Sequence, residues 1–142
     1  MTADQVIAAL DLAPHPEGGW YRQTFASEAA PGVRPASTAI YFLLRAGEAS
    51  HWHRVDADEI WLWHAGAPLI LSVSETDAGP AQDTTLGVDL AFQRVVPAGH
   101  WQAARATGDW SLVSCVVAPG FRFEGFELAA PDLDIPRIEN DS

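Results

Sequence analysis

Most of this chain consists of short segments that are rich in β-branched and aromatic residues and are separated by clusters of Gly, Pro, Asp or Ser. Such segments are typical of β-strands. The segments of this kind are Ser37–Arg45, Glu59–His64, Pro68–Glu75, Phe92–Val96, His100–Arg105, Trp110–Ala118 and Phe121–Leu128. Because no helical pattern lies between them, an antiparallel sandwich or barrel is favoured over a parallel α/β sheet. The sequence therefore predicts an all-β fold.

One short helix is expected at the N-terminus. Thr2 can cap a segment whose apolar residues fall on one face, and that segment should end near Leu12. A turn should follow at residues 15–19, His-Pro-Glu-Gly-Gly, because the proline lacks a backbone donor and the glycines permit positive φ. Residues 77–83 are expected to form the tip of a hairpin.

The length and charge of the chain limit its domain count and its partners. The 142 residues suffice for one domain, which we expect to span residues 1–128, followed by an acidic C-terminal tail at 129–142. Eight arginines stand against nineteen acidic residues, which gives a net charge of −11. Such a surface repels phosphate backbones and anionic lipids, so we expect neither nucleic-acid nor membrane partners.

The N-terminal segment and the single cysteine favour a cytoplasmic location. The first ten residues contain no Lys or Arg, which is atypical of a secretory signal. Cys115 cannot form an intrachain disulfide, as fits a reducing compartment. It lies in an apolar segment without a basic neighbour in sequence, so we interpret it as an inert core thiol.

Potential metal ligands are concentrated between residues 47 and 66. His51 and His53 are two residues apart, which places them on the same face of a strand, and an acid on the next strand could complete three sides of a metal site. Glu59 is the preferred acid because it shares a strand face with Trp61 and Trp63. Asp58 is the alternative.

Each of these residues also has a structural interpretation. The two histidines could bind an organic ligand by hydrogen bonds without a metal. Glu59 could instead form a partly buried ion pair with Arg54 or Arg45. The tryptophans could simply belong to the core.

A second cluster, Pro97-Ala-Gly99-His100-Trp-Gln102, places a Pro-x-Gly turn before a strand. Together the two clusters resemble the two motifs of the cupin superfamily, which implies a jelly-roll barrel, or double-stranded β-helix. In that family the first motif has three or four residues between the second histidine and the glutamate, whereas five separate His53 from Glu59 here. The family's second-motif histidine corresponds to Gln102, whose carbonyl oxygen could bind a metal, and His100 is the alternative ligand.

Five separated blocks, two of which overlap these clusters, make the resemblance more specific. The chain is similar to the cupin-like family known as domain of unknown function 985 (DUF985) from about Asp4 to Leu128. The blocks begin at His15, Ser37, His53, Val96 and Ala118. The resemblance implies an often dimeric barrel with a pocket in its mouth, and it implies no reaction.

The expected cofactor is one divalent ion, namely zinc, nickel, iron or manganese, held by His51, His53, Glu59 and Gln102. We expect Trp61 and Trp63 to line the pocket as an aromatic wall. Glu17 and Arg22 are candidates for the pocket rim. An anionic ligand would need Arg22, Arg45 or Arg54 near it.

Three classes of function are compatible with these residues. The first is a small-molecule-binding cupin with a divalent metal in the barrel. The second is a metal-free sugar or sugar-nucleotide isomerase or epimerase. In such an enzyme a histidine removes a proton beside a carbonyl and a tyrosine, here Tyr21 or Tyr41, returns one. His53 and Glu59 are the other candidate catalytic residues. The third is a non-catalytic binding protein. A homodimer is expected in each case, because a small sheet protein must cover its edges and its outer apolar face.

Overall fold

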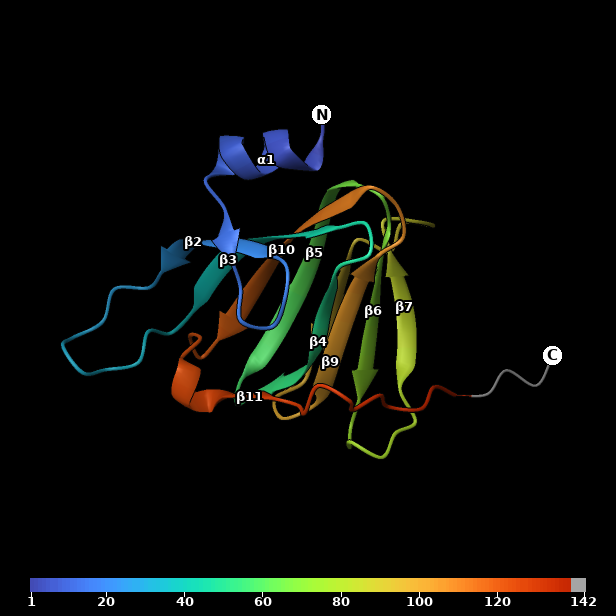
Figure 1. Ribbon diagram of the computed structural model, residues 1–142. Coiled ribbons are helices and arrows are strands. Elements are labelled where there is room, and N and C mark those ends of the chain that lie inside the picture. The colour runs from blue at the N-terminus through green and yellow to red at the C-terminus, as the bar shows by residue number, and fades with distance from the viewer. Residues whose placement is uncertain (139–142) are drawn as a thin grey trace.

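The computed structural model describes residues 1–138 and contains two antiparallel sheets that face each other (Figure 1). In spatial order, the first sheet contains β1 (Ala13–Pro14), β2 (Trp20–Ala26), β3 (Thr38–Arg45), β10 (Trp110–Ala118), β5 (Asp58–Gly66) and β8 (Gln93–Val96). The second contains β11 (Phe126–Leu128), β4 (Ala49–Val55), β9 (Trp101–Ala106), β6 (Leu69–Ser74) and β7 (Gln82–Leu86). From β3 onward the chain crosses between the sheets after every strand except β6, as in a jelly roll. The predicted all-β fold is confirmed.

The N-terminal helix, α1 (Ala3–Leu10), begins where its sequence predicts. The Thr2 hydroxyl accepts a hydrogen bond from the Gln5 amide, and the Gln5 side chain accepts one from the Thr2 amide, which completes a capping box. Val6 is buried in one apolar cluster with Leu12 and Leu43 of β3. The helix therefore covers one end of the first sheet.

Three parts of the chain differ from the predicted strand pattern. Residues 121–128, expected as one strand, form a 3-10 helix, η1 (Phe123–Gly125), before β11. Gly125 at the end of η1 lies so close to the Asp56 carboxylate that a Cβ atom there would be only 2.3 Å from Cγ, so this position requires glycine. β2 and β7 were not predicted, because their exposed polar residues hide the alternation that marks a half-buried strand.

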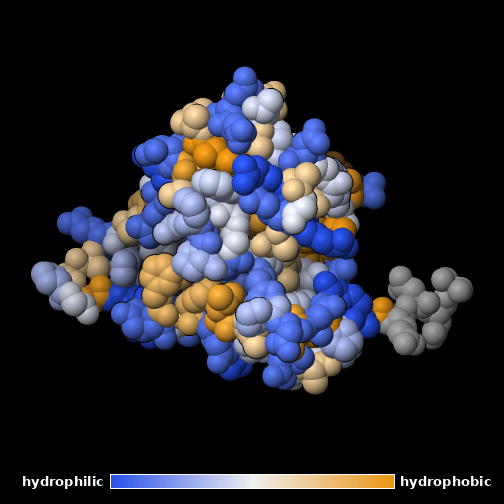
Figure 2. Space-filling model, viewed as in Figure 1, coloured by the Kyte–Doolittle hydropathy of each residue, from blue (hydrophilic) through white to orange (hydrophobic). Residues whose placement is uncertain are grey.

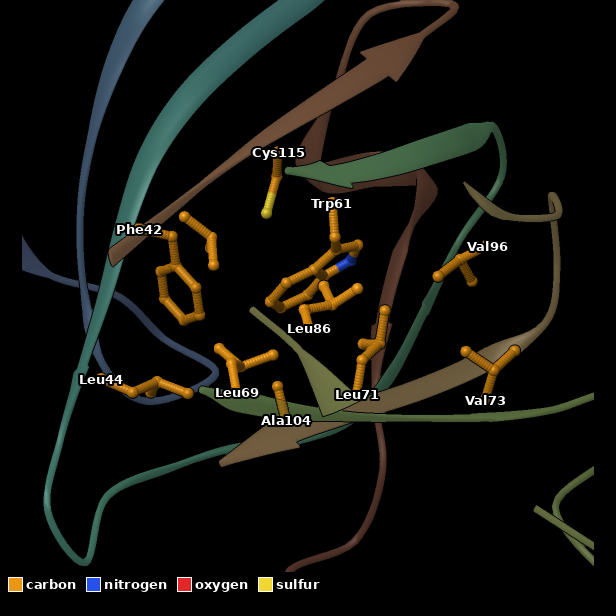
Figure 3. Close-up of a cluster of buried hydrophobic side chains, with 11 residues drawn as sticks. Phe42, Leu44, Trp61, Leu69, Leu71, Val73, Leu86, Val96, Ala104 and Cys115 are labelled. Carbon is orange, nitrogen blue, oxygen red and sulfur yellow. The ribbon is translucent and has the colours of Figure 1, made fainter. Parts of the chain in front are cut away.

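The largest apolar cluster fills the space between the sheets (Figure 3). It combines side chains of β3, β5, β6 and β10, and Trp61 and Phe42 are its largest members, each 1% exposed. Cys115 belongs both to this cluster and to the wall of a cavity. The cavity therefore begins where the core ends.

The segment after β11 lies along the second sheet. The Ala129 amide donates to the Trp52 carbonyl, and Ile135 is fully buried in a cluster with Trp52 and Trp101. Residues 129–138 of the expected tail are therefore packed against the barrel. Residues 139–142 of that tail lie outside the described part of the chain. Within residues 1–138, no helix has the length and apolar character needed to cross a membrane.

Candidate functional site

A cavity of about 220 Å³ lies between the two sheets at the end of the core. Its wall combines aromatic rings with a small number of ionisable side chains. The lining residues are His15, Glu17, Tyr21, Gln23, Thr38, Ile40, His53, Val55, Glu59, Cys115, Val117, Phe121, Phe123 and Phe126. A hydrophobic patch is visible on the surface near β11, next to the aromatic part of this wall (Figure 2).

The aromatic part of the wall is held by polar contacts of the residues just before η1. The Phe121 amide donates to the Thr38 hydroxyl of β3, at 2.9 Å. Arg34 donates to the Gly120 carbonyl through Nε and to the Asp56 carboxylate through Nη2. Asp56 also accepts a hydrogen bond from Arg122. These contacts fix the rings of residues 121–126 over the cavity.

A tight turn brings Glu17 into the cavity. The His15 amide donates to the Gly19 carbonyl and the Gly18 amide to the His15 carbonyl, which closes the turn. Gly18 has a φ of +105°, and a Cβ atom there would lie 2.2 Å from the Ala49 carbonyl oxygen of β4. Only glycine permits this approach. The turn can therefore dock on β4, where the His51 amide donates to the Glu17 carbonyl.

Glu17 and His53 form a buried ion pair in the cavity wall. Oε2 of Glu17 lies 2.8 Å from Nε2 of His53 and accepts a second hydrogen bond from the Ser50 hydroxyl. Burial favours neutral His53, but the charge and hydrogen bond of Glu17, aided by Glu59, outweigh it and raise the pKa of His53 to about 9. Burial likewise raises the pKa of Glu17, but its contacts with His53 lower it overall. Both groups are therefore charged at neutral pH.

Glu59 ends a second chain of hydrogen bonds. Its Oε1 accepts from Nε2 of Gln102, and Oε1 of Gln102 accepts from Nε1 of Trp61 at 2.7 Å. Burial, with the nearby charge of Glu17, raises the pKa of Glu59 to about 7, although the His53 charge opposes this. Glu59 therefore titrates close to neutral pH.

His15 is a further ionisable group of the cavity. Its Nδ1 accepts a hydrogen bond from the Glu17 amide at 3.1 Å, so the ring proton of the neutral form resides on Nε2. Burial lowers the pKa of His15 against the opposing effect of the Glu17 charge. The ring packs edge-on to Tyr21, with centroids 4.5 Å apart. His15 is thus a neutral imidazole beside a phenol.

Some of the sequence-predicted site residues meet at this cavity. His53, Glu59, Glu17 and Tyr21 line it, and Gln102 is buried directly behind Glu59. The predicted alternatives to two of them lie elsewhere: the exposed Asp58 accepts a hydrogen bond from the Ala98 amide, and His100 lines an outer groove with Glu75 and Arg94.

The structure does not bring the other predicted residues to the cavity. Nε2 of His51 contacts the Ala130 carbonyl on the outer side of the second sheet. Arg22 donates to the Leu10 carbonyl, and Tyr41 packs against His64. The two tryptophans expected as a pocket wall, Trp61 and Trp63, are packed in or against the core, and neither lines the cavity.

The predicted ligand set does not fit a divalent ion as the side chains are arranged. Nδ1 of His53 lies 2.8 Å from the His51 carbonyl oxygen, and Nε2 of His53 faces Glu17. Both contacts use a proton on the ring nitrogen, whereas a metal ligand needs an unprotonated nitrogen. Among residues 1–138, no three His, Cys, Asp or Glu side chains are grouped as a metal centre requires.

Sequence reasoning did not place His15 or the three phenylalanines, Phe121, Phe123 and Phe126, in the site. His15 and Phe121 occur in the blocks that resemble DUF985, but nothing in their spacing indicates a shared cavity. Their only local signals are the glycine-rich turn after His15 and the aromatic run that begins at Phe121.

Comparison with known proteins agrees with this architecture. The family described as Cupin superfamily (DUF985) matches residues 4–129. A solved structure of a Shewanella oneidensis protein is similar, with 43% identity, a TM-score of 0.84, and coverage of 92% of this chain and 85% of that chain. A protein from Leishmania major described as hypothetical is also similar, with 32% identity and a TM-score of 0.84. The match covers 94% of this chain and 90% of that chain.

Oxalate decarboxylase from Bacillus subtilis is similar in fold alone. It has 14% identity and a TM-score of 0.63, and the match covers 81% of this chain but only 29% of that chain. No curated protein matches this sequence.

Proposed function

We propose, since this chain belongs to the DUF985 family of the cupin superfamily, that it binds a small organic molecule in the cavity of its barrel. The observation that carries the proposal is the buried ion pair of Glu17 and His53 in the wall of a cavity of about 220 Å³. Ligand sites typically combine apolar and aromatic walls with a few polar groups that converge on the ligand. This cavity has that composition.

The energetics of the pair support a role in binding. Glu17 is 8% exposed and His53 is 2% exposed, so both charges have lost most of their hydration. A buried ion pair is often no more stabilising than apolar side chains of the same volume. Strongly shifted pKa values that occur together in a cavity are characteristic of functional sites.

The proposal is tested by filling the cavity. Ile40→Trp adds volume to the lining, and Val33→Trp adds the same side chain at an exposed loop position. Binding of small aromatic and heterocyclic fragments is followed by saturation-transfer NMR. We expect wild type and Val33→Trp to bind the same fragments and Ile40→Trp to lose them while it retains the β-type circular dichroism. Equal binding by all three proteins would contradict the proposal.

A second candidate function is acid-base catalysis on a carbonyl compound. It is favoured by the contact between His15 and Tyr21 in the cavity, because a neutral imidazole can remove a proton beside a carbonyl and a phenol can donate one. Incorporation of deuterium from D₂O into neutral aldoses and ketoses, followed by proton NMR, tests it. Tyr21→Phe should abolish the exchange and Tyr41→Phe, on the outer face, should not.

We also propose a homodimer formed through the outer face of the first sheet. Tyr41 and His64 pack together there, and Val95 is 53% exposed on the same sheet. A second copy of the chain would cover such a face through one self-complementary contact. Light scattering should give about twice the 15.3 kDa of one chain, and Val95→Lys should lower that mass. A single-chain mass for wild type at micromolar concentration would contradict this.

A cytoplasmic location is part of the same proposal. It is supported by the single cysteine, Cys115, whose thiol is buried and whose pKa is raised by burial, so that it is unreactive. Fractionation of cells that express the full chain tests it.

A further inference from the structure

The positions of the arginines determine which ligand charges the cavity can accept. In the described part of the chain, no arginine lines the cavity. The three arginines that an anionic ligand would require have other partners: Arg22 donates to the Leu10 carbonyl, Arg45 pairs with Glu48, and Arg54 pairs with Glu127. A carboxylate or phosphate in the cavity would therefore lack its usual bidentate partner.

Among the described residues that line the cavity, the one cationic side chain, His53, is already neutralised. His53 directs Nε2 at Glu17 and Nδ1 at the His51 carbonyl, so both of its donors are used. An anion could displace Glu17 only by leaving that carboxylate buried without its partner, which is costly.

The oxygens of two carboxylates in the cavity wall can accept further hydrogen bonds. Oε1 of Glu59 accepts one from Gln102 and the Cys115 thiol is also hydrogen-bonded to this carboxylate, which uses two of its roughly four acceptor positions. Oε1 of Glu17 lies 3.4 Å from Nδ1 of His15, which already accepts the Glu17 amide. A ligand that brings N–H groups would satisfy these oxygens.

The size and shape of the cavity limit the ligand to a small ring. A cavity of roughly 150 Å³ with an apolar lining holds benzene, so about 220 Å³ accommodates one ring with a polar substituent. The rings of His53 and Phe126 are 5.5 Å apart and tilted by 35°. The phenylalanines offer flat surfaces to a planar ligand.

We infer that the cavity selects a flat, single-ring ligand that is neutral or monocationic and directs its N–H groups to Glu59, and that it discriminates against carboxylates and phosphates. This inference rests on the proposed function, because it names the ligand class of the same cavity. It also separates the chain from enzymes that act on sugar nucleotides, whose diphosphate would need cationic side chains.

Three probes of nearly equal shape test the inference: benzamidine, which is cationic, benzamide, which is neutral, and benzoate, which is anionic. Their affinities for the wild-type protein are measured by ligand-observed NMR at pH 8, where Glu59, whose pKa is about 7, is mostly ionised and His53 is still charged. We expect benzamidine and benzamide each to bind at least about tenfold more tightly than benzoate, the ratio typical of one hydrogen bond to a charged group. Tighter binding of benzoate would overturn the inference and leave the proposed function intact. Failure of all three probes to bind at millimolar concentration would contradict both.

Glu59→Gln tests the assigned acceptor. The substitution should lower the preference for benzamidine over benzoate by about tenfold, while Glu75→Gln, a matched change at an exposed position, should leave it unchanged. Glu59→Gln is used only if its melting curve is cooperative, and the wild-type ranking of the probes decides the inference in any case. An unchanged preference in a folded Glu59→Gln protein would contradict the assignment.

Discussion

Nε2 of His53 lies 2.8 Å from Oε2 of Glu17, and the two residues reach each other from separate parts of the chain. His53 belongs to β4, while Glu17 lies in the turn before β2. The contact depends on Gly18, because the turn packs against the Ala49 carbonyl so closely that no side chain would fit at that position. The ion pair links the N-terminal turn to the barrel and sets the charge of the cavity.

The pair should make stability depend on pH in the alkaline range. The pKa of His53 is raised from 6.5 to about 9 in the folded protein. Its stabilising effect is therefore fully present below about pH 6.5 and is lost as the pH rises through 9. We expect the free energy of unfolding to fall on the order of 2 to 3 kcal/mol across this window. Denaturant unfolding at a series of pH values measures it.

Two variants identify the residues responsible for this dependence. Glu17→Gln and His53→Gln should each remove most of the fall between pH 6.5 and 9. The pKa of Glu59 is raised from 4.5 to about 7, so the free energy of unfolding should also fall as the pH rises from 4.5 to 7. Glu59→Gln should remove this second fall. A flat profile for wild type above pH 6.5 would contradict the ion pair.

Gln102 should be essential for stability. It is 1% exposed, and it satisfies Trp61 through its carbonyl and Glu59 through its amide. Gln102→Leu would leave two buried polar groups without partners, so we expect a loss of about 2 to 5 kcal/mol in the free energy of unfolding. Gln93→Leu, at an exposed position of β8, should change it by less than about 0.5 kcal/mol. Comparable losses in chemical denaturation of the two variants would show that the buried chain of hydrogen bonds contributes little.

Substitutions of Trp61 and of Phe126 should have different effects on stability and on ligand binding. Trp61 is enclosed by the core, so Trp61→Phe should lower the free energy of unfolding by about 1 to 3 kcal/mol, with a smaller effect on fragment affinity. Phe126 lines the cavity and is partly exposed, so Phe126→Ala should weaken fragment binding about tenfold or more. Melting curves and NMR titrations of both variants distinguish the roles. The opposite pattern would restore Trp61 as the pocket wall.

Chelation should leave the folded protein unaffected, because the predicted ligands do not converge. His51 faces Ala130 and both nitrogens of His53 face acceptors. We expect the same melting temperature before and after treatment with EDTA, and no stabilisation by added Zn²⁺ or Mn²⁺. A specific ion at a hundredfold over its Kd would instead add about 2.7 kcal/mol. Such a gain, lost in His53→Ala, would establish a metal site.

Local patterns in the sequence were enough to predict some elements of the fold. Thr2 and Gln5 identify the helix start because a capping box depends on residues three apart. β10 has the predicted bounds, Trp110–Ala118, because apolar residues dominate a central strand. The alternation of β5 also separates the exposed Asp58 from the buried Glu59, since successive residues of a strand face opposite sides.

The composition of the cavity depends on contacts between distant parts of the chain. His51 and His53 were expected on one face, but the pairing of β4 with β9 shifts register between Ser50 and His53, so that His51 faces outward. Such an irregularity depends on the partner strand, and β4 alone carries no sign of it. Glu17 and His15 reach His53 through a turn that docks across the sheets. The class of fold and the inward-facing acid of β5 can be predicted from the sequence because they depend on local periodicity, whereas packing between distant segments sets which charges share the cavity.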